Sequence, residues 1–172
     1  HMSRLLNQLL SDASVIHRSN LQRYAPVDLA ETIHQALHEA EPQVEPIPRV
    51  HLAMSAGPVW VQGDALLLRE AIKNLIDNAI KYSAAAPLQV ALTLVGDKAV
   101  LTIADHGPGI APSDAERVFE RFARGEGAAA GGAGLGLAIV KRVVDAHGGR
   151  IDLSNRREGG LVATIVLPRS HA

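Results

Sequence analysis

Hydrophobic residues recur at helical spacing in four segments of the chain and form shorter apolar runs, bounded by turn residues, elsewhere. The clearest helical segment spans residues 64–82, where Ala71, Leu75, Ile76 and Ala79 fall on one side of the helix. Further helices are predicted over residues 3–20, 28–40 and 135–147, with a shorter one near 115–122. Strands are predicted over residues 24–27, 50–54, 59–62, 88–95, 99–104, 150–154 and 161–167.

Cap and turn residues support these boundaries. Asp28 and Asp64 are N-cap candidates, and Glu31 stands at capping-box spacing from Asp28. Three prolines within residues 41–48 predict a loop, and Gly96-Asp97 predicts a hairpin. Helices dominate the first half and antiparallel hairpins the second. We therefore expect an α+β fold: a two-layer α/β sandwich with a mixed, mostly antiparallel sheet covered on one face by helices.

Composition narrows the class of protein. The 172 residues suit one compact unit, or one domain plus a short extension, and 47% of them are hydrophobic. Aromatic residues make up only 3%, so the core must be built from Leu, Ile, Val and Ala. The formal net charge of −1 provides no basic surface for nucleic acid or anionic lipid, and no cysteine is present. His1-Met2 is typical of a tag remnant, so we expect the chain to be part of a longer protein.

The helix over residues 64–82 carries a polar stripe opposite its apolar side. Glu70, Asn74, Asn78 and Lys81 share about a quarter of its circumference. Carboxamide oxygens one turn apart suit Mg²⁺, which takes few protein ligands when phosphates supply the rest. An ordinary solvated helix face explains the same stripe, so the stripe alone does not decide between the two.

Two glycine clusters add candidate ligand contacts. Asp105 follows a predicted strand and precedes Gly107-Pro-Gly109, where a flat base can approach the backbone, although a plain tight turn has the same composition. Gly132-Ala-Gly-Leu-Gly136 leads into a helix whose N-terminal N–H groups favour phosphate, although such a loop is often only a flexible connector. Arg121 and Arg124 precede this loop and can supply positive charge.

In combination, the order and spacing of these motifs resemble the ATP-binding catalytic domain of bacterial sensor histidine kinases, within the GHKL superfamily shared with DNA gyrase. The match covers about residues 23–168, with the closing glycines most similar to osmosensor-type kinases. Asn74-Leu-Ile-Asp-Asn-Ala-Ile-Lys-Tyr82 resembles the N box and Asp105-His-Gly-Pro-Gly109 the G1 box. Val118-Phe-Glu-Arg-Phe122 resembles the F box and Gly132-Ala-Gly-Leu-Gly-Leu137 the G2 box. The resemblance implies a Bergerat-type fold.

The resemblance also implies roles for individual residues with ATP and Mg²⁺ as ligands. Asn78 would bind Mg²⁺ beside Asn74, and Asp105 would accept a hydrogen bond from the adenine amine. Phe119 and Phe122 would anchor the lid. The remaining implied ATP contacts are Lys81 and Tyr82 for phosphate and ribose, Gly107, Gly109 and Ile110 for the base, Arg124 for the terminal phosphate, and Gly132, Gly134, Leu135, Gly136 and Leu137 for the phosphate chain.

Departures from the family pattern refine the predicted function. Gyrase-like ATPases carry a glutamate where this chain has Asn74, which favours transfer of the γ-phosphate to a protein side chain over hydrolysis. No phosphoacceptor motif occurs, and the context of His17 does not fit one. We therefore expect residues 1–22 to be the tail of a dimerisation helix, residues 23–172 the ATP-binding domain, and the acceptor histidine to lie outside the chain. Lys81, Asn74 and Arg124 would position phosphate.

The resemblance further implies partners and a location. These are the protein's own dimerisation domain, a response regulator, a homodimeric parent, and the cytoplasmic side of a bacterial inner-membrane protein, with no nucleic acid and no direct membrane contact by this domain. Two alternatives stay open: a nucleotide-gated regulatory module and a self-contained ATPase.

Overall fold

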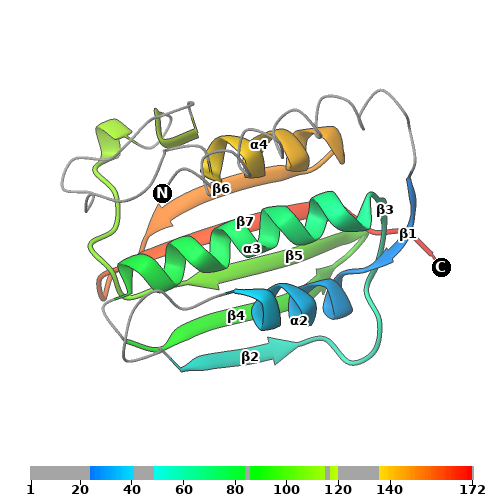
Figure 1. Cartoon of the computed structure of the whole chain (residues 1–172), viewed down its shortest axis with the longest axis horizontal. Coiled ribbons are helices and arrows are strands. Elements are labelled where there is room, and N and C mark those ends of the chain that lie inside the picture. The colour runs from blue at the N-terminus through cyan, green and yellow to red at the C-terminus, as the bar shows by residue number, and fades with distance from the viewer. Residues whose placement is uncertain (1–23, 41–48, 84–85, 115–116, 120–135, 172) are drawn as a thin grey trace.

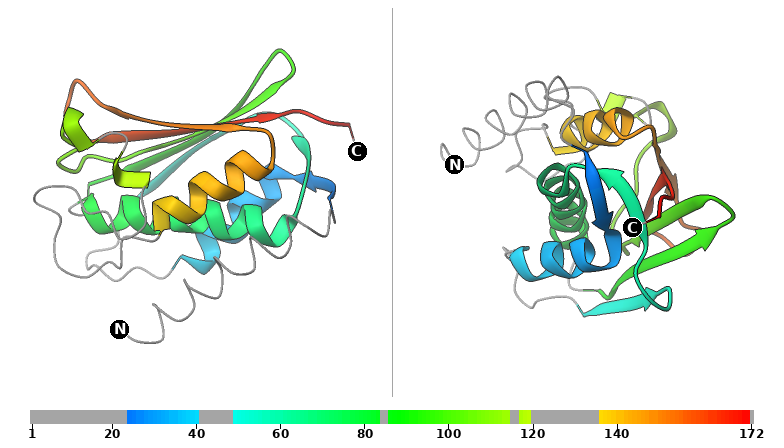
Figure 2. Two further views of the ribbon diagram at one scale, coloured as in Figure 1. Left: turned by 90° about the horizontal axis from the view of Figure 1, so that it is seen from above. Right: turned by 90° about the vertical axis from the view of Figure 1, so that its right-hand side faces the viewer.

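The computed structural model describes residues 24–40, 49–83, 86–114, 117–119 and 136–171. A layer of three helices covers one face of a five-stranded sheet (Figures 1 and 2). This confirms the predicted α+β sandwich. The helix predicted over residues 3–20 and the loop over 41–48 lie outside the described residues, as do the proposed boundary between residues 22 and 23 and Phe122.

The main sheet has the strand order β2-β4-β5-β7-β6. Only β2 runs parallel to its neighbour β4, and the other three pairings are antiparallel. The strands are β2 (Val50–Met54), β4 (Leu88–Val95), β5 (Lys98–Ala104), β6 (Arg150–Asn155) and β7 (Leu161–Pro168). A separate two-stranded antiparallel sheet joins β1 (Ala25–Asp28) to β3 (Trp60–Gly63).

The predicted caps begin two of the helices. Asp28 Oδ1 accepts from the Ala30 N–H at the start of α2 (Leu29–Glu39), and Asp64 Oδ1 accepts from two N–H groups at the start of α3 (Ala65–Tyr82). Glu31, at capping-box spacing from Asp28, accepts from Gln35 Nε2 at 3.2 Å. The third helix, α4 (Gly136–Ala146), ends before Gly148, whose φ of 68° places it in the left-handed region.

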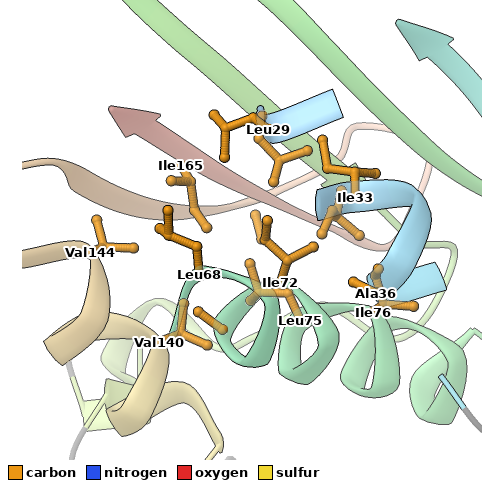
Figure 3. Packing of buried hydrophobic residues seen from close by; sticks show 14 of the residues in the cluster. Leu29, Ile33, Ala36, Leu68, Ile72, Leu75, Ile76, Val140, Val144 and Ile165 are labelled. Carbon is orange, nitrogen blue, oxygen red and sulfur yellow. The ribbon is translucent and has the colours of Figure 1, made fainter. Parts of the chain in front are cut away.

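The core lies between the sheet and the helices, with α3 packed between α2 and α4 (Figures 1 and 3). It is aliphatic, as the composition predicted: its largest fully buried side chains are Leu, Ile and Val. The four residues assigned to the apolar side of α3 are all buried, together with Leu67, Leu68, Ile72 and Ile80. This packing holds the opposite, polar side of α3 in a fixed orientation. None of the helices in the described ranges is both long and apolar enough to cross a bilayer.

Two segments depend on contacts that the local sequence pattern does not show. Both strands predicted around Ser55–Pro58 are present, and they belong to different sheets: β2 joins the main sheet, whereas β3 pairs with β1. Val59 directs this choice, because its N–H donates to Asp28 Oδ1 and its carbonyl accepts from the Leu29 N–H. The short helix expected near 115–122 is wrong where it is described: Arg117–Phe119 forms a single 3₁₀ turn, and another precedes it at Pro112–Asp114.

Candidate functional site

The polar face of α3 meets the N-terminus of α4. A Cβ placed on Gly136, the first residue of α4, would lie 3.6 Å from Asn74 Oδ1 and 3.8 Å from Asn78 Nδ2. Both asparagines are half-buried in α3. The carboxamide stripe and the end of the second glycine cluster, more than 50 residues apart in sequence, are therefore neighbours.

Asn74 carries an unusual polar atom. Its Nδ2 is fully buried and has no hydrogen-bond partner within the described part of the chain. Leaving a buried amide donor without a partner costs on the order of 1–3 kcal/mol. Such a group fits a site in which a ligand completes the hydrogen bonding.

Asp105 lies at the end of β5 and is buried, with 6% of its surface exposed. Its Oδ1 accepts from the N–H groups of Gly107 (2.8 Å) and Leu161 (3.1 Å). Its own N–H donates to the Leu161 carbonyl, and its carbonyl accepts from Arg156 Nη1 at 3.0 Å. Because both donors within the described residues take Oδ1, the second carboxylate oxygen, Oδ2, is left for a ligand.

The first glycine cluster lies against the C-terminal end of α3. A Cβ on Gly107 would overlap the carbonyl oxygen of Tyr82, the last residue of the helix. Only glycine allows this approach without moving the backbone. Asp105 is therefore near the C-terminal end of α3, and Gly107 and Gly136 both lie against the C-terminal half of this helix.

The donor set in this half of α3 fits a magnesium ion that arrives with phosphates. Within the described residues, no group of three His, Cys, Asp or Glu side chains could hold a metal ion alone. Neutral carboxamide oxygens are weak ligands by themselves but suit Mg²⁺ whose other ligands are phosphate oxygens and water. Asn74 Oδ1 lies beside the N-terminus of α4, where backbone N–H groups favour anions, and Asn78 is the neighbouring carboxamide on the same helix face.

Of the other predicted site residues, some are described by the structure and some lie outside the described ranges. Lys81 and Tyr82 lie at the same end of α3, with Lys81 Nζ 5.4 Å from the Tyr82 ring centroid. Leu137 packs partly buried against the core, so it supports α4. Ile110 is held through its backbone by Asn155. Phe119 packs partly buried against the core. Arg124, Gly132, Gly134 and Leu135 lie outside the described residues.

The sequence interpretation missed the contribution of the turn between β6 and β7. Arg156 and Asn155 hold the backbone of the Asp105–Ile110 segment through side-chain hydrogen bonds. Gly160, with φ of 104°, passes so close to the Asp105 carbonyl that any Cβ would overlap it. The pair Gly159-Gly160 was the available signal, whereas nothing in the sequence pattern marks Asn155.

A second polar cluster fixes the opposite end of α3. His147 Nε2 accepts from the Asp64 N–H at 3.0 Å, so the proton of the neutral ring is on Nδ1, which donates to the Val143 carbonyl at 2.6 Å. Burial lowers the pKa of His147, outweighing the opposing effects of that backbone carbonyl and of Asp64. Tyr24 stacks on the His147 ring at 4.7 Å and donates to the Ala146 carbonyl. This cluster braces α3 and α4 far from Asp105.

Comparison with known proteins agrees with this geometry. Residues 63–171 match the family model described as histidine kinase-, DNA gyrase B- and HSP90-like ATPase. The chain is 36% identical over 164 residues to the sensor protein QseC of Salmonella typhi, covering 95% of this chain but 36% of that protein. It therefore spans about a third of the length of the curated relatives it matches.

Solved structures give the same assignment. The mycobacterial sensor histidine kinase MprB is 35% identical with a TM-score of 0.77, and the match covers 87% of this chain and 99% of that one. Full-length ShkA, solved in complex with AMPPNP, is 28% identical with a TM-score of 0.83 over 100% of this chain and 36% of that one. The chain therefore belongs to the histidine kinase-, DNA gyrase B- and HSP90-like ATPase family, as the ATP-binding catalytic domain of a sensor histidine kinase.

Proposed function

We propose that the C-terminal half of α3, between Gly107 and Gly136, holds Mg²⁺–ATP and presents its γ-phosphate to a histidine outside this chain. The observation that carries the proposal is the convergence on this half of the helix: Gly136 lies against Asn74 and Asn78, and Gly107 lies against Tyr82. One nucleotide then spans from the Asp105 carboxylate to the N-terminus of α4. The AMPPNP bound to the similar protein ShkA supports a nucleotide as ligand.

At the base end, Asp105 would recognise an exocyclic amine. Its Oδ1 is committed to two backbone N–H groups, so Oδ2 would accept from the adenine amine. A hydrogen bond to a charged acceptor contributes about 1.5–3 kcal/mol. A base with a carbonyl at the same position would instead set two acceptors against each other.

At the phosphate end, Asn78 would bind Mg²⁺, with Asn74 beside it. Mg²⁺, when bound, neutralises charge on the phosphate oxygens. The first N–H groups of α4, from Gly136 and Leu137, would hold the phosphate chain together with Gly132, Gly134 and Leu135. Lys81, Tyr82 and Arg124 would supply the remaining phosphate and ribose contacts.

Phosphoryl transfer requires little covalent chemistry from the protein, so positioning and charge neutralisation supply most of the rate. Asn74 cannot act as a base toward water, which favours transfer over hydrolysis. We infer that the acceptor histidine belongs to a helical dimerisation domain of the same protein, that residues 1–22 are the end of that domain, and that the parent is a homodimeric inner-membrane sensor. The phosphoryl group would pass from this histidine to a response regulator.

Calorimetric titration of the chain with Mg²⁺–ATP tests the base end through Asp105→Asn. The two backbone N–H donors will keep the amide oxygen facing them, so the amide NH₂ will face the ligand and repel the adenine amine. We expect ATP affinity to fall about tenfold or more and inosine triphosphate to gain relative to ATP. The exposed Asp97, in the β4–β5 turn, provides the matched control Asp97→Asn. An unchanged ATP affinity in Asp105→Asn would remove the base assignment.

Transfer is tested in a longer chain that includes the preceding helices. We expect acid-labile, base-stable phosphohistidine from labelled ATP, abolished by Asn78→Ala. Steady phosphate release without phosphoprotein would indicate a self-contained ATPase. ATP binding without either product would indicate a regulatory module.

A further inference from the structure

Asn155 forms a two-point contact with the Asp105–Ile110 segment. It is the last residue of β6, and its side chain lies against the backbone of Ile110, 45 residues earlier in the chain. Its Oδ1 accepts from the Ile110 N–H at 2.9 Å, and its Nδ2 donates to the Ile110 carbonyl at 2.7 Å. Only one orientation of the amide satisfies both bonds, so the carboxamide substitutes for a neighbouring strand.

The backbone around Ile110 is shaped to receive this side chain. Gly109 has a φ of 72°, and a Cβ there would overlap Asn155 Oδ1 and lie 3.3 Å from the Gly160 carbonyl oxygen. The loop therefore passes directly over the carboxamide, and two glycines leave the space for it. Within the described residues, both hydrogen bonds from Ile110 to another element go to Asn155.

We propose that Asn155 is a positioning residue for the nucleotide base: by bridging the N–H and carbonyl of Ile110, it presets the 107–110 loop for the ligand that Asp105 binds. This inference rests on the proposed function, because it takes the base to lie between Asp105 and that loop. Asn155 does not contact the ligand itself. Without it, binding would have to order the loop backbone, and that ordering opposes binding.

The position of Asn155 distinguishes it from the phosphate contacts. It lies on the sheet beside the Asp105 segment, whereas Asn74 and Asn78 lie on α3 against Gly136. Loss of Asn155 should therefore lower the affinity for every ligand that carries adenine by one common factor, whether or not the ligand carries phosphate. Loss of Asn78 should weaken Mg²⁺–ATP and leave adenosine unaffected.

The test is calorimetry of the full chain with adenosine, Mg²⁺–ADP and Mg²⁺–ATP. For Asn155→Ala we expect dissociation constants roughly tenfold higher for all three ligands, because ordering about one residue of loop backbone on binding costs about 1–2 kcal/mol. Asn155→Asp keeps the acceptor for the Ile110 N–H but sets an oxygen against the Ile110 carbonyl, so it should bind no better than Asn155→Ala. Ser154→Ala, an exposed neighbour on the same strand, is the matched control and should bind like the unmodified chain.

Amide hydrogen exchange of the ligand-free chain provides a second readout. The Ile110 N–H should exchange faster in Asn155→Ala while amides in the core strands keep their rates. A variant that unfolds at lower temperature but binds adenosine with unchanged affinity would overturn the inference. A loss of affinity confined to the phosphorylated ligands would also overturn it. If the unmodified chain binds neither adenosine nor ATP, the proposed function itself fails, a result distinct from either of these.

Discussion

Two adjacent glycines in the β6–β7 turn allow a direct test of how closely the turn approaches Asp105. Gly159 and Gly160 both have positive φ, 93° and 104°. A Cβ on Gly159 would have no heavy atom within 4 Å, whereas a Cβ on Gly160 would overlap the Asp105 carbonyl oxygen and lie 2.8 Å from its carbon. The variants Gly159→Ala and Gly160→Ala therefore share a backbone cost but differ in the close contact.

The expected losses of stability follow from the backbone cost of a positive φ and from the close contact. Holding a residue other than glycine at such φ costs about 1–3 kcal/mol, and both variants should lose that much stability. Gly160→Ala should lose a further ~1–3 kcal/mol, because the overlapped atoms are backbone and cannot move aside cheaply. For a domain of this size, each kcal/mol corresponds to about 2–4 °C in Tm.

Urea unfolding monitored by circular dichroism gives the free energies of unfolding, and calorimetry gives the adenosine affinity. We expect Gly160→Ala to be clearly the less stable of the two and to bind adenosine more weakly, because Asp105 must shift. Gly159→Ala should retain normal affinity. Equal losses of stability, or full adenosine affinity in Gly160→Ala, would refute the assigned contact between the turn and Asp105.

Three further predictions concern stability. His147 has a lowered pKa in the folded state, so the neutral ring contributes fully to the free energy of unfolding above about pH 6.5. This contribution is lost as the pH falls through the folded pKa, and the free energy of unfolding then falls by up to about 1.4 kcal/mol per pH unit. Urea midpoints measured against pH should lose this component in His147→Gln and keep it in the exposed-site control His38→Gln. Asp64→Ala should destabilise the chain by about 1–2 kcal/mol in urea, with partial recovery in Asp64→Ser, because two capping hydrogen bonds are lost. Thermal unfolding of the core variants should show a loss of about 2–5 kcal/mol for Ile76→Ala and about 0.5–1.5 for Ile76→Val; equal effects would contradict the full burial of this side chain.

Features encoded locally could be predicted from the sequence. The helix from Ala65 to Tyr82 follows from its cap and its apolar period, and its buried side is the predicted one. The turn after Asp105 follows from the residue types at Gly107 and Gly109. The helix and the turn each depend on contacts between residues that are close in sequence, so the local sequence pattern is enough to predict them.

Features that depend on residues distant in sequence could not be predicted in this way. The strands flanking Ser55–Pro58 were predicted correctly, but the sequence pattern gave no prediction of their neighbours, because the contacts of Val59 with Asp28 and Leu29 join residues about thirty positions apart. Asn155 gave no signal for a related reason. A single exposed carboxamide at a strand end has no periodicity, and its function is defined by the backbone that folds against it.

In the proposed complex, one adenine nucleotide extends from Asp105 to the Asn78 side of α3. A crystal structure of the chain with a non-hydrolysable ATP analogue and Mn²⁺, phased to locate the anomalous signal, tests it most directly. We expect an anomalous peak within coordination distance of Asn78 Oδ1 and the adenine amine hydrogen-bonded to the Asp105 carboxylate. A nucleotide whose base lies away from Asp105, or a metal ion away from α3, would contradict it.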